Sequence, residues 1–393
     1  MYDVTSIRED FPVLKDVIYL DSAATTQTPV QVVTAMNDYF YRFAGNYGRG
    51  AHRLARETTN HYEESREKVA SFLNVDHSKI IFTKNTTEGI NMVAKGMEWH
   101  DGDHIITTLI EHHSNFVPWL NLKRCGIDVD VIEPDSRGII DPADIDAAIS
   151  DNTRLIAISH VSNVFGSIQD IESIIRIAHR NDIQVLVDGA QSAGHMVVDI
   201  SALNCDFFAT SGHKGLLGPQ GTGIMYIKDP DDLEPVYLGG GTVHGVGMDS
   251  FELEPFPARF EAGTPNIPGV IGLGRSIEYI QDIGIKNIEK HENELTEYAI
   301  SRLSEIPMVE TYGPENRTGV IPFNISGMNS HDVAMIMDET KRICVRSGYH
   351  CAMPAIEFLK MNGAVRASFG LYNTVEEVDV FADTVSQITS LVS

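Results

Sequence analysis

Between about residue 60 and residue 230, short apolar runs alternate with amphipathic runs along the chain. The apolar runs lack a regular polar face, so they predict strands that are buried on both sides, as in a mostly parallel sheet. Seven runs of this kind are Lys79–Phe82, His104–Thr108, Asp128–Ile132, Leu155–Ser159, Ile183–Asp188, Asp206–Ala209 and Gly223–Ile227. Strands and helices in alternation indicate α/β layers. Between two of these runs, Asp170–Arg180 shows a helical pattern, with one apolar stripe formed by Ile171, Ile174, Ile175 and Ala178.

The pattern changes after about residue 275, where a smaller α+β domain is predicted. A long helical run covers Asn287–Ile306, and a second helix is expected to begin at Thr374, because Glu377 completes a capping box. Strand-like pieces lie between them, at Thr318–Ile325, Lys341–Val345 and Ala364–Phe369. The chain has 393 residues, more than the roughly 250–300 that one hydrophobic core supports. We therefore expect a large α/β domain at 20–270 and a small domain formed by 1–19 and 271–393.

The net charge of the chain limits the kinds of partner that it can bind. The chain carries 30 Lys and Arg against 55 Asp and Glu, a net charge of −25. Phosphates are repelled at long range, so we expect no nucleic-acid partner and no anionic membrane surface. No apolar run approaches the roughly 18 residues of a membrane span, and the charged start of the chain lacks the apolar region of a secretion signal. A cytoplasmic protein is the default expectation, and the acidic excess indicates solubility.

The chain contains four cysteines, Cys125, Cys205, Cys344 and Cys351. Four cysteines in so long a chain do not form a disulfide framework. No CxxC pair or His/Cys cluster has the spacing of a structural zinc site, so we expect no metal.

The most informative segment is the glycine-rich stretch 210–223, in which Lys214 lies between two apolar strands. Glycines allow the backbone to approach a ligand closely. A lysine held in a cleft can have a lowered pKa and act as a Schiff-base nucleophile. Ser211 and His213 flank Lys214 as candidate phosphate donors. The alternative is a lysine on a surface loop, which would not need such surroundings.

Two further segments support a cofactor site. Asp188 ends a buried strand, and ligands of open α/β sheets lie beyond the carboxyl ends of strands. A carboxylate there could pair with the cationic ring nitrogen of pyridoxal phosphate, although a helix N-cap is the ordinary role of such an Asp. In Phe82–Gly89 a strand ends and a helix begins at the hydroxyls of Thr86 and Thr87. Helix starts bind phosphate, and a Thr N-cap without a ligand is the equal alternative on this segment alone.

Ten motifs in order along the chain match those of one known family, at Tyr19–Thr26, Arg49–His52, Thr86–Asn91, Glu111–Asn115, His160–Gly166, Asp188–Gln191, Ser211–Lys214, Arg259–Asn266, Arg346–Pro354 and Arg366–Ser368. Over nearly its full length the chain thus resembles the pyridoxal phosphate-dependent cysteine desulfurases and selenocysteine lyases. Within the class V aminotransferase-like branch of fold type I, it is most similar to the SUF-type (group II) desulfurases. This resemblance implies the fold type I architecture, with a large domain built on a mostly parallel seven-stranded sheet and a smaller α+β domain.

The resemblance implies roles for individual residues. Lys214 corresponds to the Schiff-base lysine that later carries a proton, and Asp188 to the partner of the pyridine nitrogen. Gln191 corresponds to the partner of the ring hydroxyl, and His112, which directly follows the Glu of its motif, to the residue stacked on the ring. The phosphate contacts implied are Thr86, Thr87, Ser211 and His213, with Thr264 reaching the phosphate of the other subunit of a homodimer. The substrate contacts implied are Asn163 and Arg366 at the α-carboxylate, with Arg346, His52 and Arg53 lining the pocket.

Cys351 is the nucleophile that the resemblance implies, with His350 and Arg346 as its activators. Composition alone favours a small buried core cysteine, and the surrounding motif reverses that interpretation. Position 349 is Tyr where related chains often have a second His. Cys125, Cys205 and Cys344 have no such surroundings and are expected to be core or incidental.

The implied activity is the conversion of L-cysteine to L-alanine, with sulfur held as a persulfide on Cys351 for an acceptor protein in Fe–S cluster or other sulfur-cofactor assembly. Selenocysteine lyase activity on L-selenocysteine is the nearest alternative. A kynureninase, epimerase or aminotransferase of the same fold would use Lys214 and Asp188 but not Cys351. A persulfide carrier without catalysis is a further alternative, which Lys214, Asp188, His112 and Arg366 together argue against.

Overall fold

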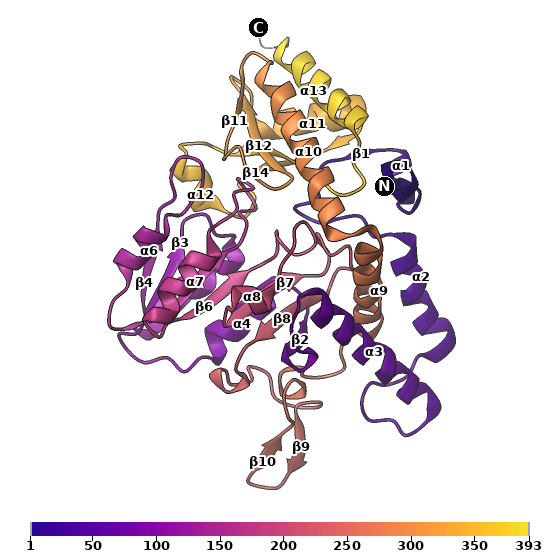
Figure 1. Ribbon diagram of the computed structural model, residues 1–393, viewed down its shortest axis with the longest axis vertical. Coiled ribbons are helices and arrows are strands. Elements are labelled where there is room, and N and C mark those ends of the chain that lie inside the picture. Colours follow the sequence, from indigo (N-terminus) through magenta and orange to yellow (C-terminus); the bar gives the residue numbers. More distant parts are fainter. Residues whose placement is uncertain (1, 392–393) are drawn as a thin grey trace.

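A seven-stranded sheet forms the centre of the large body in the computed structural model, which describes residues 2–391 (Figure 1). Its strand order is β2-β8-β7-β6-β5-β3-β4, and all neighbours are parallel except β8, which runs antiparallel to both β7 and β2. The strands are β2 (Ile80–Thr83), β3 (His104–Thr108), β4 (Asp128–Ile132), β5 (Thr153–Ser159), β6 (Gln184–Asp188), β7 (Phe207–Ser211) and β8 (Gly223–Ile227). The predicted mostly parallel seven-stranded sheet is confirmed, and the strand ends shift by at most two residues.

Both faces of this sheet are buried except at the edge strand β4, and residues of the other strands alternate between two hydrophobic clusters. In β5, Ile156 and Ile158 belong to one cluster, whereas Leu155 and Ala157 belong to the other. Helices cover the two faces. The helices that pack on this body are α2 (Val30–Asp38), α3 (Arg53–Phe72), α4 (Thr86–Gly96), α5 (Val117–Leu122), α6 (Pro142–Ala148), α7 (Ile171–Arg180), α8 (Ile200–Leu203) and α9 (Ile267–Ile283).

The smaller body carries a four-stranded antiparallel sheet with the order β11-β12-β15-β14. Leu295, Phe323 and Phe381 lie in its own hydrophobic cluster, which joins the helices to the sheet. The N-terminal strand β1 (Ile18–Tyr19) pairs with β13 (Ile343–Cys344) and so ties the start of the chain to this body. The elements are β11 (Val309–Thr311), β12 (Val320–Ile325), β14 (Arg346–Gly348), β15 (Ala364–Ser368), α10 (Ile285–Ser304), α11 (Ser330–Lys341), α12 (Met353–Phe358) and α13 (Val375–Thr389), with α1 (Val4–Glu9) nearby.

Two predicted helices are confirmed in detail. The apolar stripe of α7 is buried at all four of its positions. Helix α13 begins after Thr374, whose side chain accepts from the Glu377 amide while the Glu377 carboxylate accepts from the Thr374 amide. Each contact satisfies an amide that the helix itself leaves without a partner.

The packing of α9 bears on where the two bodies divide. Its residues Ile271, Leu273 and Ile277 belong to the hydrophobic cluster of the large body, and it packs on α2 and α3. Contacts therefore favour a division near Gly284, between α9 and α10, and a domain boundary at residue 270 stays a prediction. None of the helices within residues 2–391 combines the length and hydrophobicity needed to cross a membrane.

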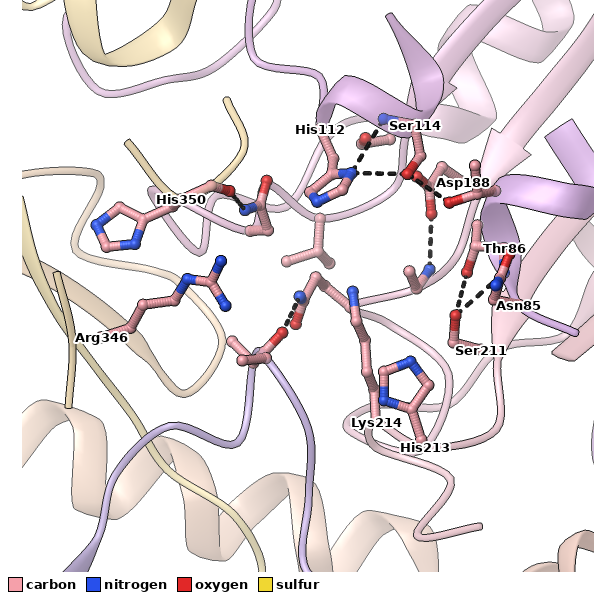
Figure 2. A pocket seen from close by; sticks show the side chains of 18 of the residues that line it. Asn85, Thr86, His112, Ser114, Asp188, Ser211, His213, Lys214, Arg346 and His350 are labelled. Carbon is pink, nitrogen blue, oxygen red and sulfur yellow. Dashed lines mark hydrogen bonds between the residues drawn. The ribbon is translucent and has the colours of Figure 1, made fainter. Parts of the chain in front are cut away.

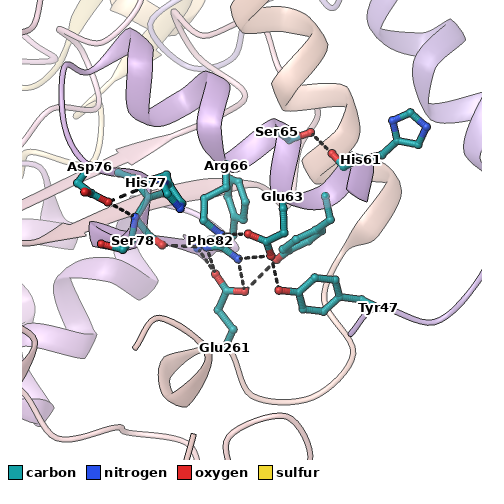
Figure 3. A network of polar contacts seen from close by, with 12 residues as sticks. Tyr47, His61, Glu63, Ser65, Arg66, Asp76, His77, Ser78, Phe82 and Glu261 are labelled. Carbon is teal, nitrogen blue, oxygen red and sulfur yellow. Dashed lines mark hydrogen bonds and ion pairs between the residues drawn. The ribbon is translucent and has the colours of Figure 1, made fainter. Parts of the chain in front are cut away.

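A buried ion pair fixes the segment that precedes α9 (Figure 3). The guanidinium of Arg66 on α3 binds both carboxylate oxygens of Glu261, at 2.7 and 3.1 Å. Glu261 also accepts from the Phe82 amide of β2 at 2.7 Å and from the Tyr62 hydroxyl at 3.1 Å. The contacts lock α3, β2 and the segment that leads to Thr264 into one unit.

This network generates a stability prediction. Glu261→Ala leaves the Arg66 guanidinium buried without its main partner, so we expect a loss of about 3–5 kcal/mol in the free energy of unfolding. Chemical denaturation measures it, with Glu294→Ala, which removes an exposed carboxylate of α10, as the control. Equal stability of the two variants would contradict the role of the buried pair.

Candidate active site

A cavity of about 240 Å³ opens at the carboxyl edge of the large sheet. Strands β3, β5, β6 and β7 are parallel and end at this edge, and β2 ends there too because β8 reverses between it and β7. Side chains that follow these strands therefore meet in one place. The predicted residues in the lining are Thr86, Thr87, His112, Asn163, Asp188, Gln191, Ser211, His213 and Lys214 from the large body, with Arg346 and Arg366 from the small body.

Lys214 extends its amine towards the space between His112, Asp188 and Arg346 (Figure 2). Its carbonyl accepts from the Thr26 hydroxyl at 2.6 Å, which holds the backbone of the turn. The next residue must be glycine, because a Cβ on Gly215 would lie 2.5 Å from the carbonyl oxygen of Ala193. Burial lowers the pKa of Lys214 to about 8, against the opposing attraction of Asp188 and with help from the positive charges of Arg366 and Arg346.

Asp188 is the last residue of β6 and is buried. One carboxylate oxygen accepts from the Ala190 amide at 2.9 Å. Burial raises the pKa of Asp188, while that hydrogen bond and Lys214 lower it. A carboxyl group in this position gains most from a cationic partner inside the cavity, such as a protonated ring nitrogen. Gln191 lies beside it, and its amide nitrogen donates to the Ala23 carbonyl at 2.8 Å, which leaves the amide oxygen to accept from a ring hydroxyl.

The start of α4 forms an anion cradle. Its N-cap Asn85 accepts from the Glu88 amide at 2.9 Å. The Ser211 hydroxyl accepts from the Thr86 amide at 3.1 Å and lies 2.6 Å from the Thr86 hydroxyl, which ties the helix start to the end of β7. Hydroxyls and the positive end of the helix dipole together suit a phosphate group.

His112 is connected to this cradle by a chain of hydrogen bonds. Its Nδ1 accepts from the Ser114 amide at 3.0 Å, and the Ser114 hydroxyl lies 2.7 Å from the Thr87 hydroxyl. Burial, together with the charge of Lys214, lowers the pKa of His112 to about 3. The ring is therefore neutral near pH 7, and its proton is on Nε2.

Glu111, which precedes His112, is a supporting residue that the sequence analysis did not identify. Its buried carboxyl accepts from the Thr108 hydroxyl and the side-chain amide of Asn115, each at 2.6 Å. It also accepts from the main-chain amide of Ser159 at 3.0 Å. Burial raises the pKa of Glu111 to about 7. It joins the ends of β3 and β5 beneath His112. The motif Glu111–Asn115 signalled its presence, but its partner Ser159 is distant in sequence.

Arg366 and Asn163 form the opposite wall of the cavity. Arg366 is buried on β15, donates to the Asn163 carbonyl at 2.9 Å and pairs with Asp21 at 3.1 Å. The Arg366 Nε and the Asn163 Oδ1 are buried and have no partner within the described residues. The Arg366 Nε is a buried donor that needs an acceptor, and a carboxylate suits the guanidinium, whereas the Asn163 Oδ1 is an acceptor that needs a donor. Asp21, which orients Arg366, was also missed by the sequence analysis.

Cys351 lies beside the cavity, with its Sγ 3.7 Å from the Arg346 Nη2. Burial, followed by the charges of Arg366 and Arg346, lowers the pKa of His350 to about 3, so this ring is neutral. Of the two predicted activators, Arg346 is therefore the charged one. Tyr349 contributes its carbonyl, which accepts from the Ala352 amide at 2.9 Å. The other cysteines lie elsewhere: Cys125 is exposed, Cys205 is buried in the core and Cys344 lies in β13.

Besides Cys351, which lies next to the lining residue His350, three predicted residues do not line this cavity in the single chain. Thr264 lines a separate hollow of about 700 Å³ beside Tyr237. His52 is exposed and caps α3, where its Nδ1 accepts from an amide at 3.3 Å, and Arg53 pairs with a carboxylate one turn along that helix. The part of the chain described by the structure contains no His, Cys, Asp and Glu cluster able to hold a metal.

The cavity supplies a partner for each part of pyridoxal phosphate: the Lys214 amine for the aldehyde, Asp188 for the ring nitrogen, and the α4 cradle for the phosphate. The residues therefore fit this group. Fold and site together define a class, the α/β enzymes that hold a cofactor through a buried lysine.

Comparisons with known proteins narrow the class. The model of the class V aminotransferase family matches residues 18–381. A protein of Methanothermobacter thermautotrophicus named "Probable cysteine desulfurase" is 49% identical, with 98% of each chain covered. The cysteine desulfurase structure of Thermococcus onnurineus NA1 is 43% identical, with a TM-score of 0.95 and 98% of each chain covered. The cysteine desulfurase CsdA of Escherichia coli is 36% identical with a TM-score of 0.93, covering 100% of this chain and 99% of that one. The chain belongs to the class V aminotransferase family.

The lowered pKa of Lys214 generates a pH prediction. A lysine with a pKa of about 8 is mostly neutral, and so nucleophilic, above pH 8. The rate at which cofactor-free protein reacts with pyridoxal phosphate should therefore rise with a midpoint near pH 8. Asp188→Asn removes the attraction that raises the Lys214 pKa and should move the midpoint to lower pH. A midpoint at the ordinary lysine value in the unsubstituted protein would contradict this account.

Proposed function

We propose that the protein is a pyridoxal phosphate-dependent cysteine desulfurase. It takes sulfur from L-cysteine, releases L-alanine and holds the sulfur on Cys351 for transfer to an acceptor protein. The observation that carries the proposal is the position of Cys351, with its Sγ 3.7 Å from Arg346, which itself lines the cavity of Lys214 and Asp188. Similarity to cysteine desulfurases over nearly the whole chain supports it.

Pyridoxal phosphate, when bound, supplies an electron sink that acidifies the α-carbon of the amino acid joined to it. Lys214 holds the cofactor and afterwards moves the proton at the α-carbon, for which a pKa of about 8 is well suited near neutral pH. Asp188 would hold a proton at the ring nitrogen. His112 would stack on the ring and present its Nε2 proton, and Thr86, Thr87, Ser211 and His213 would bind the phosphate.

Arg366 and Asn163 bind the α-carboxylate of the substrate. The unpartnered Arg366 Nε and the fixed guanidinium plane suit a carboxylate held by two hydrogen bonds. Because both residues are buried, water is excluded from this contact, which strengthens the attraction.

The sulfur step is balanced without an added oxidant or reductant. The thiolate of Cys351 attacks the substrate sulfur, a sulfur–sulfur bond forms, and the bond between the substrate β-carbon and its sulfur breaks. The bonding electrons pass to the β-carbon, which takes up a proton. The Cys351 thiol and L-cysteine thus become a Cys351 persulfide and L-alanine. The Arg346 guanidinium stabilises the negative charge at Sγ before the attack.

A homodimer would complete the site. Thr264, His52 and Arg53 lie outside the cavity of their own chain, which suits residues that serve the cavity of a second copy. The hairpin of β9 (Val243–Val246) and β10 (Phe251–Leu253) projects from the large body, far from the small one (Figure 1). Its apolar tip is exposed, with Met248 at 99%, which favours a contact surface for that copy.

Other activities of the same fold have no use for Cys351. A kynureninase, epimerase or aminotransferase would need no thiol beside Arg346, and a carrier without catalysis would need no lysine of lowered pKa in the cavity. L-Selenocysteine is the alternative substrate, since the same contacts suit it. All four cysteines are free, which suits a reducing cytoplasm.

The nucleophile is tested by Cys351→Ala. Alanine and sulfide formation from L-cysteine should fall roughly 100-fold or more, because no thiolate accepts the sulfur, while the absorption change on adding L-cysteine remains. Cys125→Ala, which removes an exposed cysteine, should match the unsubstituted protein. Lys214→Ala should lose both the absorption change and turnover. Normal sulfide release by Cys351→Ala would refute the assignment.

The carboxylate contact is tested by Arg366→Lys. Lysine keeps the charge but loses the two-point contact, so the KM for L-cysteine should rise about 10- to 100-fold. Steady-state kinetics measure the change, with Arg176→Lys on the exposed face of α7 as the control. An unchanged KM would remove Arg366 from the substrate site.

A further inference from the structure

The loop that carries Cys351 has an unusual backbone. It runs from β14 to α12, and the consecutive residues His350 and Cys351 have φ angles of 51° and 56°. Both lie in the left-handed region, which residues other than glycine seldom adopt, and two in succession are rarer still. Such a conformation persists only where the surroundings impose it.

Hydrogen bonds to His350 hold one side of this loop. The Asn163 amide donates to the His350 carbonyl at 2.8 Å, and the His350 ring donates to the Ala364 carbonyl at 3.0 Å. Both contacts precede Cys351, so they do not fix the chain that follows it. After Cys351 the Ala352 amide donates to the Tyr349 carbonyl at 2.9 Å, but this contact lies within the loop, so a restraint from the large body is still needed.

His113 supplies that restraint by binding the loop at two points. Its main-chain amide donates to the Cys351 carbonyl at 2.7 Å. Its ring Nε2 accepts from the amide of Met353, the first residue of α12, at 3.1 Å. First-turn amides have no hydrogen-bond partner inside their own helix, and the methyl side chain of the N-cap Ala352 cannot accept a hydrogen bond from them. The His113 ring therefore caps α12 from a different part of the chain.

The ring is suited to this role. Partial burial lowers the pKa of His113, so the ring is neutral near pH 7 and Nε2 is free to accept while Nδ1 has the proton. The preceding residue, His112, lines the cavity, and the two ring centroids lie 6.3 Å apart. One peptide bond thus connects a residue that lines the cavity to the residue that caps α12, and the preceding Glu111 is itself held by Thr108 and Asn115.

We propose that His113 is a positioning residue, which holds the Cys351 loop from the large body so that Sγ remains beside Arg346 at a fixed place relative to His112. The inference rests on the proposed desulfurase function. His113 does not line the cavity, and it acts through the Cys351 carbonyl and the Met353 amide. Removing the ring frees the loop on one side only, since the main-chain contact stays.

His113→Ala tests the proposal in the cofactor-loaded protein. The kcat for alanine formation should fall about tenfold, with KM for L-cysteine and the cofactor absorption unchanged, because Arg366, Asn163 and Lys214 are untouched. Hydrogen exchange of the Met353 amide should quicken about tenfold. His113→Gln, whose amide oxygen can accept the same hydrogen bond, should restore both values, and the exposed His77→Ala should change neither.

Unchanged kcat and unchanged Met353 exchange in His113→Ala would overturn the proposal. Failure of His113→Gln to restore them, at a melting temperature equal to that of the unsubstituted protein, would overturn it as well. If the unsubstituted protein forms no alanine from L-cysteine, the proposed function fails separately. In that case hydrogen exchange of the Met353 amide tests the restraint on the loop by itself. Faster exchange in His113→Ala that returns to the original rate in His113→Gln supports the restraint. Equal exchange in His113→Ala and the unsubstituted protein overturns the proposal.

Discussion

The site depends on one geometric constraint, the common direction of β3, β5, β6 and β7. Parallel strands end at the same edge, so the residues that follow them meet although they are distant in sequence. His112, Asn163, Asp188 and Lys214 reach one cavity in this way. The reversal at β8 then brings the end of β2 to the same edge, which adds the helix start of α4 and its capacity for an anion.

Burial decides the charges inside this cavity. It is the largest influence on Lys214, His112, His350 and Asp188, and in each case it disfavours the charged form. The attraction between Asp188 and Lys214 opposes burial without cancelling it, so the lysine pKa remains near 8. The result is a site with neutral imidazoles and a reactive amine. Arg346 and Arg366 supply fixed positive charge, one beside Cys351 and the other where a carboxylate would bind.

The main sheet could be predicted from sequence because burial on both faces leaves uniformly apolar runs, and the glycine-rich turn marked Lys214. The contacts of Glu111, Asp21 and His113 could not be predicted from the sequence. Their partners are Ser159, Arg366 and Met353, and only the folded chain brings these together. The packing of α9 could not be predicted for a similar reason, because the sequence of an apolar helix does not show which body the helix packs against.

The central claim is that Cys351 takes the substrate sulfur, and mass spectrometry after a single turnover tests it most directly. Cofactor-loaded protein is mixed with L-cysteine in the absence of reductant, digested, and its four cysteine-containing segments are compared. The account predicts that the segment with Cys351 gains the mass of one sulfur atom, with one alanine released for each sulfur gained. Alanine release with sulfur on Cys125 or Cys344, or with none on Cys351, would contradict it.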